Sequence, residues 1–161
     1  MLFVNYGSFA KIFSTATVAS ISYKYNTLFA PAGYAFSIWS LIFIFCIGFV
    51  IHQFYLLRTN DPNEFIRRSG IWFSIGNLSN ALWVYCWINE LLGYSVILII
   101  ILLISLVKQM LNLLPDYDNK LTKNRLWIWW PITIYLGWII VATVACVAAF
   151  LVYIGWNGGA L

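Results

Sequence analysis

The strongest constraint in this sequence is a series of long stretches without a charged side chain. Residues 25–57 form an uncharged run of 33 residues, and residues 69–89 and 126–161 form runs of 21 and 36 residues. A helix needs only about 20 apolar residues to cross the roughly 30 Å hydrocarbon layer of a bilayer. A further run, residues 91–107, consists mostly of Leu, Ile and Val. These runs predict membrane-spanning helices.

The composition indicates the same class of protein. The chain is 63% hydrophobic and 9% charged, whereas soluble domains contain about 25% charged residues. Its net charge of +4 is carried between the apolar runs, which indicates membrane orientation and not nucleic-acid binding. We therefore expect an all-α integral membrane protein with lipid as a partner and no nucleic-acid partner.

The apolar runs, and the charged, Pro and Gly residues that separate them, predict a single transmembrane domain over residues 1–161. This domain is expected to be a bundle of five helices. The expected helices are residues 1–13, 34–57, 69–89, 91–114 and 127–153, with a loop at residues 14–33. The first helix is short or incomplete, because thirteen apolar residues cannot span a bilayer. Together with the uncharged end GWNGGAL, it predicts a chain that is truncated at both ends.

Three motifs occur in the order found in one known family. They are FAPAGYAFSIWSLIF at residues 29–43, SNALWVYCW at 79–87 and PITIYLGWIIVAT at 131–143. With these motifs the chain resembles the translocator protein family, also called tryptophan-rich sensory protein (TspO), and within it a TspO-like subset with PAGY-type loops. The resemblance implies a planar hydrophobic ligand, a porphyrin-like tetrapyrrole or a sterol-like lipid, in a pocket between helices. It also implies a sensory, regulatory or transport role, and it is compatible with a homodimer.

The third expected helix carries amides and indoles at helical spacing. Asn77 and Asn80 are three residues apart, and Trp83 continues the same stripe. Because an amide inside a bilayer must find a partner, hydrogen bonding between helices is the simpler interpretation, and we expect it for Asn77. For Asn80 and Trp83, the family resemblance supports pocket lining equally well.

The fifth expected helix places Trp138, Ala142 and Ala145 on one face. Small residues there either let a neighbouring backbone approach closely or leave room for a flat ligand beneath an indole. In the resembled family, a tryptophan followed four residues later by Ala-Thr belongs to the ligand pocket. Cys146 stands where that family often has an asparagine, so the identity of the ligand stays open. The expected ligand-binding residues are Trp39, Asn80, Trp83, Trp138, Ala142 and Thr143, with residues 14–33 as a lid.

Titratable side chains are not gathered inside the apolar runs. The single histidine is His52, and the acidic residues, Asp61, Glu64, Glu90, Asp116 and Asp118, all fall in expected loops or turns. The three cysteines lie in separate runs without a CxxC pair. We therefore expect no catalytic or metal-binding residues, no enzyme activity and no required cofactor, with a tetrapyrrole only as a ligand. Light-dependent porphyrin breakdown, which has been suggested for the family, finds no acid-base set here.

A second interpretation needs no ligand. The chain would be a membrane scaffold, or a fragment of a larger multi-helix carrier, in which the tryptophans serve as interfacial belts and as packing. Trp127, Trp129 and Trp130 are expected to form such a belt.

Basic residues are distributed unevenly between the two sides of the expected bundle. Residues 58–68 carry three arginines and residues 115–125 carry Lys120, Lys123 and Arg125, whereas the opposite side carries Lys24. Lysine and arginine are enriched in cytoplasmic loops. Both basic loops are therefore expected to be cytoplasmic.

This orientation predicts the outcome of cysteine labelling at Asn63 and Asn119, one in each basic loop. Each introduced cysteine should react with a membrane-impermeant reagent only after the cells are permeabilised. A reaction at either position in intact cells would contradict the orientation.

Overall fold

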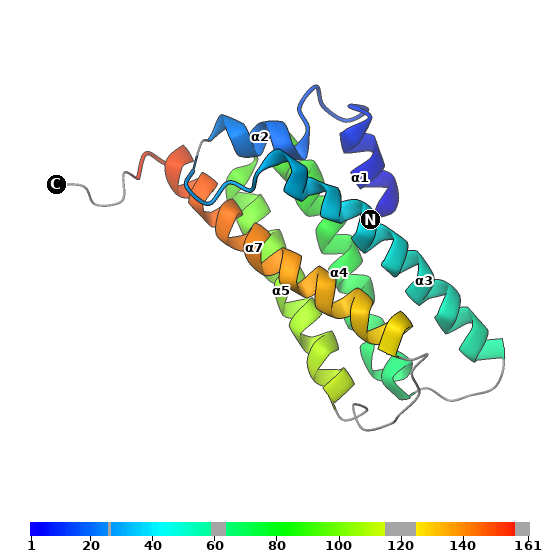
Figure 1. Ribbon diagram of the computed structural model, residues 1–161. Coiled ribbons are helices and arrows are strands. Elements are labelled where there is room, and N and C mark those ends of the chain that lie inside the picture. The colour runs from blue at the N-terminus through cyan, green and yellow to red at the C-terminus, as the bar shows by residue number, and fades with distance from the viewer. Residues whose placement is uncertain (26, 59–63, 115–124, 157–161) are drawn as a thin grey trace.

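A computed structural model describes residues 1–25, 27–58, 64–114 and 125–156, and every regular element within them is helical (Figure 1). In chain order these are α1 (Leu2–Phe9), α2 (Val18–Lys24), η1 (Gly33–Ser37), α3 (Ile38–Arg58), α4 (Glu64–Ile88), α5 (Leu92–Leu113), η3 (Arg125–Trp129) and α7 (Trp130–Tyr153). The element η1 is a 3₁₀ turn and η3 is a π-helical turn. The expected all-α fold is confirmed.

The bundle consists of α1, α3, α4, α5 and α7. In Figure 1, α3, α4, α5 and α7 run along the long axis, while α1 and α2 lie at one end. Helix α4 packs against α5, α5 packs against α7, α3 contacts α7, and α1 contacts α4. As expected, the first helix is short, with eight residues.

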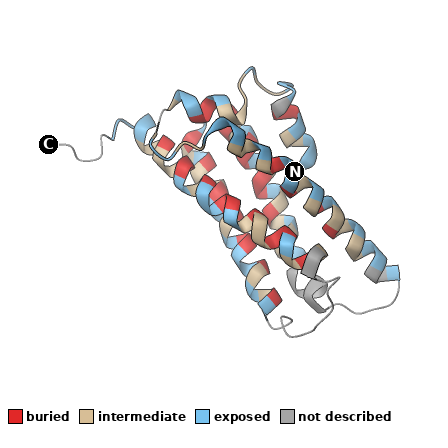
Figure 2. Cartoon of the chain, viewed as in Figure 1, coloured by how far each residue is buried: buried red, intermediate tan, exposed pale blue. Residues whose placement is uncertain are grey.

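The outer faces of the bundle suit a lipid environment. Within the described residues, three segments are long and apolar enough to cross a membrane, namely Gly33–Tyr55, Leu92–Leu113 and Trp127–Tyr153. Figure 2 marks residues of all three burial classes along the helices, with exposed and buried positions alternating on each of the long ones. On α5 the exposed residues include Ile97 and Ile104, so this helix presents an apolar face to its surroundings. Helix α4, with 25 residues, is also long, but it is more polar and contributes its fully buried Asn80 to the interior.

The expectation of a continuous loop at residues 14–33 is wrong, because α2 forms within it. Thr17 and Ser20 make a reciprocal capping box: the Thr17 N–H donates to Ser20 Oγ at 2.8 Å, and the Ser20 N–H donates to Thr17 Oγ1 at 3.2 Å. The usual box has Glu or Gln at the second position. A seven-residue helix is also too short to show a hydrophobic period. No sequence pattern therefore predicts α2.

Two other boundaries differ from expectation for physical reasons. Helix α1 ends at Phe9 and not at residue 13, because Lys11 is left-handed, with a φ of 57°. The Ile12 N–H then donates to the Gly7 carbonyl at 2.7 Å, which closes a Schellman cap. Helix α4 begins at Glu64, before the expected residue 69, so the interhelical loop expected at residues 58–68 is shorter. A helix can continue beyond the hydrocarbon, so an uncharged run underestimates its length.

The last helix starts with a π-helical turn. Pro131 lacks the N–H that would bond to the carbonyl four residues earlier, and the turn before it widens. Within that turn, the ring of Trp127 lies against Gly48 of α3 so closely that a Cβ at Gly48 would overlap it. Trp127 thus joins two helices, whereas Trp130 is 54% exposed. The interfacial belt of tryptophans stays a prediction.

The contact between Gly48 and Trp127 predicts a specific loss of stability. The substitution Gly48→Ala should destabilise the bundle by about 1–3 kcal/mol, because the indole must move. Gly137 on α7 has open space at its Cβ position, so Gly137→Ala should be neutral or stabilise by up to about 1 kcal/mol through helix propensity. Thermal unfolding of both variants in detergent tests this. Equal stability of the two variants would contradict the packing described here.

Candidate functional site

A cavity lies at the end of the bundle where α2, α3, α4 and α7 meet. We call it the tryptophan cavity. Its lining residues are Val18, Ser22, Pro31, Phe36, Trp39, Trp83, Trp87, Trp138, Ala142, Ala145 and Cys146. The cavity volume is about 20 Å³, which is room for roughly one water molecule. The cavity is therefore small in this conformation.

Indole rings from three helices form one wall of the cavity. Trp39 of α3 stacks on Trp83 of α4, with ring centroids 6.3 Å apart and planes at 28°. Trp39 also meets Trp138 of α7 edge to face, at 6.3 Å and 83°. Trp87, one turn after Trp83, extends the stack at 6.0 Å. Such pairs contribute about 0.5–1.5 kcal/mol each beyond the area they bury, so the wall also holds the three helices together.

Small side chains from α7 form the part of the wall beside the indoles. Ala142 and Ala145 are each 9% exposed and lie on the same helical face as Trp138. Cys146 is fully buried, and its Sγ lies 3.4 Å from the Ser95 hydroxyl of α5. These residues leave space that larger side chains would fill.

Two hydrogen-bond donors in the wall lack acceptors. Nε1 of Trp83 and Nε1 of Trp138 are buried and make no hydrogen bond. Trp83 Nε1 lies near the Cys146 thiol, but sulfur is only a weak acceptor. Trp87 differs, because its Nε1–H donates to the Val18 carbonyl of α2 at 3.0 Å. A buried donor without a partner costs about 1–3 kcal/mol, so an acceptor that reached either indole N–H would stabilise the protein.

Comparison with known families identifies the relationship. The profile of the TSPO-like proteins matches residues 1–161. The chain belongs to the TSPO-like protein family. No curated protein and no solved structure matched the chain. Together with its three apolar spans, the match makes this TSPO-like protein an integral membrane protein, and it confirms the resemblance found in the sequence.

The fold brings four of the six predicted site residues together. Trp39, Trp83, Trp138 and Ala142 all line the tryptophan cavity of this TSPO-like protein, although they come from three different helices. Their role in ligand binding stays a prediction.

The other two predicted residues lie outside the cavity lining. Asn80 is fully buried and its Oδ1 accepts a hydrogen bond from Asn5 Nδ2 of α1 at 2.7 Å. Thr143 Oγ1 donates to the Ile139 carbonyl of its own helix at 2.7 Å. In this conformation Asn80 therefore links two helices, and Thr143 satisfies its hydroxyl locally.

Several lining residues were missed although the sequence carried a signal for some of them. Trp87 continues the stripe of Trp83, and Phe36 shares a helical face with Trp39. Val18 and Ser22 lie within the segment expected to be a lid, but no pattern singled them out, because they belong to the unexpected helix α2. Only the packing of α2 onto the bundle reveals their position.

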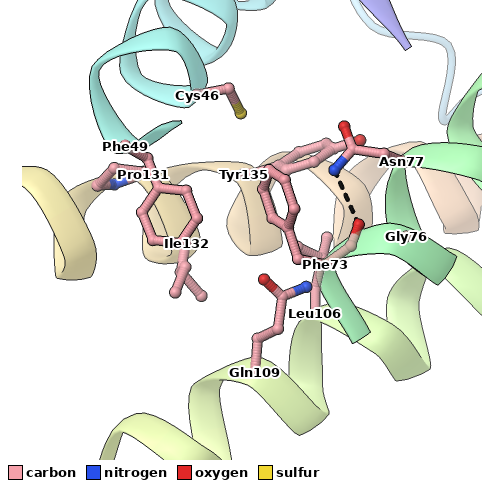
Figure 3. Close-up of a pocket in the computed structure, with 10 residues that line it drawn as sticks. All are labelled: Cys46, Phe49, Phe73, Gly76, Asn77, Leu106, Gln109, Pro131, Ile132 and Tyr135. Atoms are coloured by element: carbon pink, nitrogen blue, oxygen red, sulfur yellow. Dashed lines mark hydrogen bonds between the residues drawn. The ribbon is translucent and has the colours of Figure 1, made fainter. Parts of the chain in front are cut away.

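A second cavity lies in the half of the bundle away from α2, between α3, α4, α5 and α7 (Figure 3). We call it the amide cavity, because Asn77 and the buried Gln109 line it. Asn77 Nδ2 donates to the Phe73 carbonyl at 2.8 Å, and Gln109 Nε2 donates to the Ser105 carbonyl at 3.3 Å. Each amide thus bonds within its own helix, and the bond between helices that we expected for Asn77 is not formed.

Proposed function

We propose that this TSPO-like protein binds a flat, largely apolar molecule that carries a hydrogen-bond acceptor in the tryptophan cavity. The observation that carries the proposal is the pair of unpaired indole donors, on Trp83 and Trp138, in one aromatic wall. The family resemblance suggests a tetrapyrrole or a sterol-like lipid, and a sensory, regulatory or transport role.

The lining suits such a ligand chemically. A flat apolar molecule gains from stacking on indoles, and an acceptor on it satisfies N–H groups that are now unpaired. The lining contains no charged side chain, so a largely apolar ligand leaves no buried charge uncompensated. A tetrapyrrole offers a larger flat π-face for stacking on the indoles than a sterol does, and for this reason we favour the tetrapyrrole.

The size of the cavity implies that binding requires a conformational change. Pockets for small molecules usually have volumes of about 300–1,000 Å³, whereas this cavity has about 20 Å³. Either α2 moves away or the indoles rotate. The same close packing favours the second candidate function, a scaffold whose tryptophans only join helices. A binding experiment distinguishes the two.

The side of the membrane from which a ligand enters follows from the proposed orientation. Helix α3 ends at Arg58 and α5 ends at Leu113, at the end of the bundle opposite α2 (Figure 1). With loops 58–68 and 115–125 on the cytoplasmic side, the tryptophan cavity opens toward the non-cytoplasmic side. The ligand then arrives from that compartment or from the adjoining leaflet.

Matched substitutions on α7 test the proposal. Titration with protoporphyrin IX, followed by its own absorbance, should show saturable binding to the wild-type protein. Ala142→Leu fills the cavity and should weaken binding at least about tenfold, the equivalent of 1.4 kcal/mol, whereas Ala148→Leu, outside the lining, should not. Trp138→Phe keeps a ring but removes one donor, so it should weaken binding by about 0.5–1.5 kcal/mol.

Trp130→Ala, at an exposed position, serves as the tryptophan control. Each variant must first show wild-type thermal unfolding. Equal affinity in all variants, or no saturable binding in any of them, would support the scaffold function instead.

A further inference from the structure

We propose that Glu90 is a latch that holds α2 over the tryptophan cavity, so that one carboxylate at the edge of the bundle controls access to it. The ligand assignment rests on the proposed function, but the closing of the cavity by α2 can be tested without any ligand. Glu90 lies in the turn between α4 and α5.

Two groups from the end of α2 converge on this carboxylate. Lys24 Nζ lies 2.6 Å from both carboxylate oxygens of Glu90. The Tyr25 hydroxyl donates to Oε2 at 2.7 Å. Lys24 is the last residue of α2 and Tyr25 is its C-cap. One carboxylate outside α2 therefore makes polar contacts with two consecutive residues at the C-terminal end of this helix.

The same helix covers the cavity. Val18 and Ser22 of α2 line it, and Ser22 is buried. The N-terminal end of α2 has its own attachment, because the Val18 carbonyl accepts from Trp87 Nε1 at 3.0 Å. Beside Glu90, the C-terminal end has the edge contact of the Tyr25 ring with Tyr153, at 6.1 Å. Loss of the carboxylate would leave this end held mainly by apolar contacts.

The backbone of Glu90 is a second, independent observation. Its φ is 59°, in the left-handed region that glycine adopts without strain and other residues rarely adopt. Glu90 occupies the position after α4 where a Schellman cap usually has glycine, and the Leu91 N–H donates to the Cys86 carbonyl at 2.9 Å. A glutamate at this position strains the backbone, so its presence points to a role of the side chain.

The charges explain when the latch holds. Hydrogen bonds from Lys24 and Tyr25 lower the pKa of Glu90 below its usual 4.5, while burial, followed by the bond to Glu90, raises the pKa of Tyr25 to about 12. Tyr153 is the other titratable group beside this cluster. Because the pKa of Glu90 is lowered, the latch is fully present above pH 4.5 and is lost as the pH falls through the lowered value. The side chains of Lys24 and Glu90 are 54% and 38% exposed, so salt should weaken the pair.

The chain contains its own reporter of opening. Cys146 lines the tryptophan cavity and is 1% exposed, so a water-soluble maleimide can reach it only when the cavity opens. In a protein that carries Cys46→Ala and Cys86→Ala and is held in lipid nanodiscs, the labelling rate of Cys146 measures opening at pH 7.

Removal of the latch should raise this rate. We expect Glu90→Gln and Lys24→Met each to increase labelling about threefold at low salt, the effect expected for a partly exposed ion pair. The double variant should be no faster than the faster single one. Tyr25→Phe should also increase the rate, whereas Tyr23→Phe, with a 50% exposed ring, should not. Glu90→Gly is the most informative variant, because it relieves the backbone strain and still removes the carboxylate. It should label faster although its thermal unfolding midpoint is unchanged or higher.

Several outcomes would overturn the latch. They are wild-type labelling rates in Glu90→Gln and Glu90→Gly, an equal increase in Tyr23→Phe, and additive effects in the double variant. The protoporphyrin IX association rate, measured in the same variants, separates the two proposals. If the labelling rate of Cys146 rises in the Glu90 variants while no variant binds protoporphyrin IX, the latch is supported and the proposed porphyrin binding is refuted.

Discussion

Helix α4 carries polar side chains into an apolar bundle, where no water is available to bond with them, and its neighbours are arranged around this constraint. Asn80 is paired with Asn5 of α1. A Cβ added at Gly76 would come into ordinary van der Waals contact with side chains of α5, so α4 and α5 lie close together at this point. Trp87 donates to the carbonyl of Val18 and so attaches α2. Helices α1, α2 and α5 thus all pack against α4. These contacts cover its polar side chains, so the most polar of the long helices lies within the bundle.

The tryptophan cavity is one of several places where polar groups stay unpaired, as Ser8 Oγ, His52 Nδ1 and Asn80 Nδ2 also do. Buried polar groups in folded proteins are nearly always paired, yet the indole N–H groups of Trp83 and Trp138 are not. The rings themselves are well packed, so the unpaired donors are not a sign of a loose core. Local rules are most often broken at functional sites, where a ligand or a motion compensates. The strained Glu90, at the edge of the helix that covers this cavity, fits the same pattern.

Residue patterns identified most of the wall and placed its cover within residues 14–33, but they did not predict that the cover is a helix. Trp39, Trp83, Trp138 and Ala142 could be selected because helical spacing places them on inward faces, and the structure brings them to one cavity. Asn80 was selected by the same reasoning, but its amide is held by a partner 75 residues away in the chain. Spacing within one helix cannot show which neighbour an inward side chain meets.

The sequence by itself determined that this is a bundle of helices in a membrane, because the length of an uncharged run and the thickness of a bilayer are both fixed quantities. It also determined which faces of the helices turn inward, since that depends only on the helical repeat. Only the tertiary structure decided how Trp127 rests on Gly48, where α2 lies and which carboxylate holds it. These features depend on contacts between segments that are far apart in the chain. A local sequence pattern does not show which distant segment lies next to it in the folded protein.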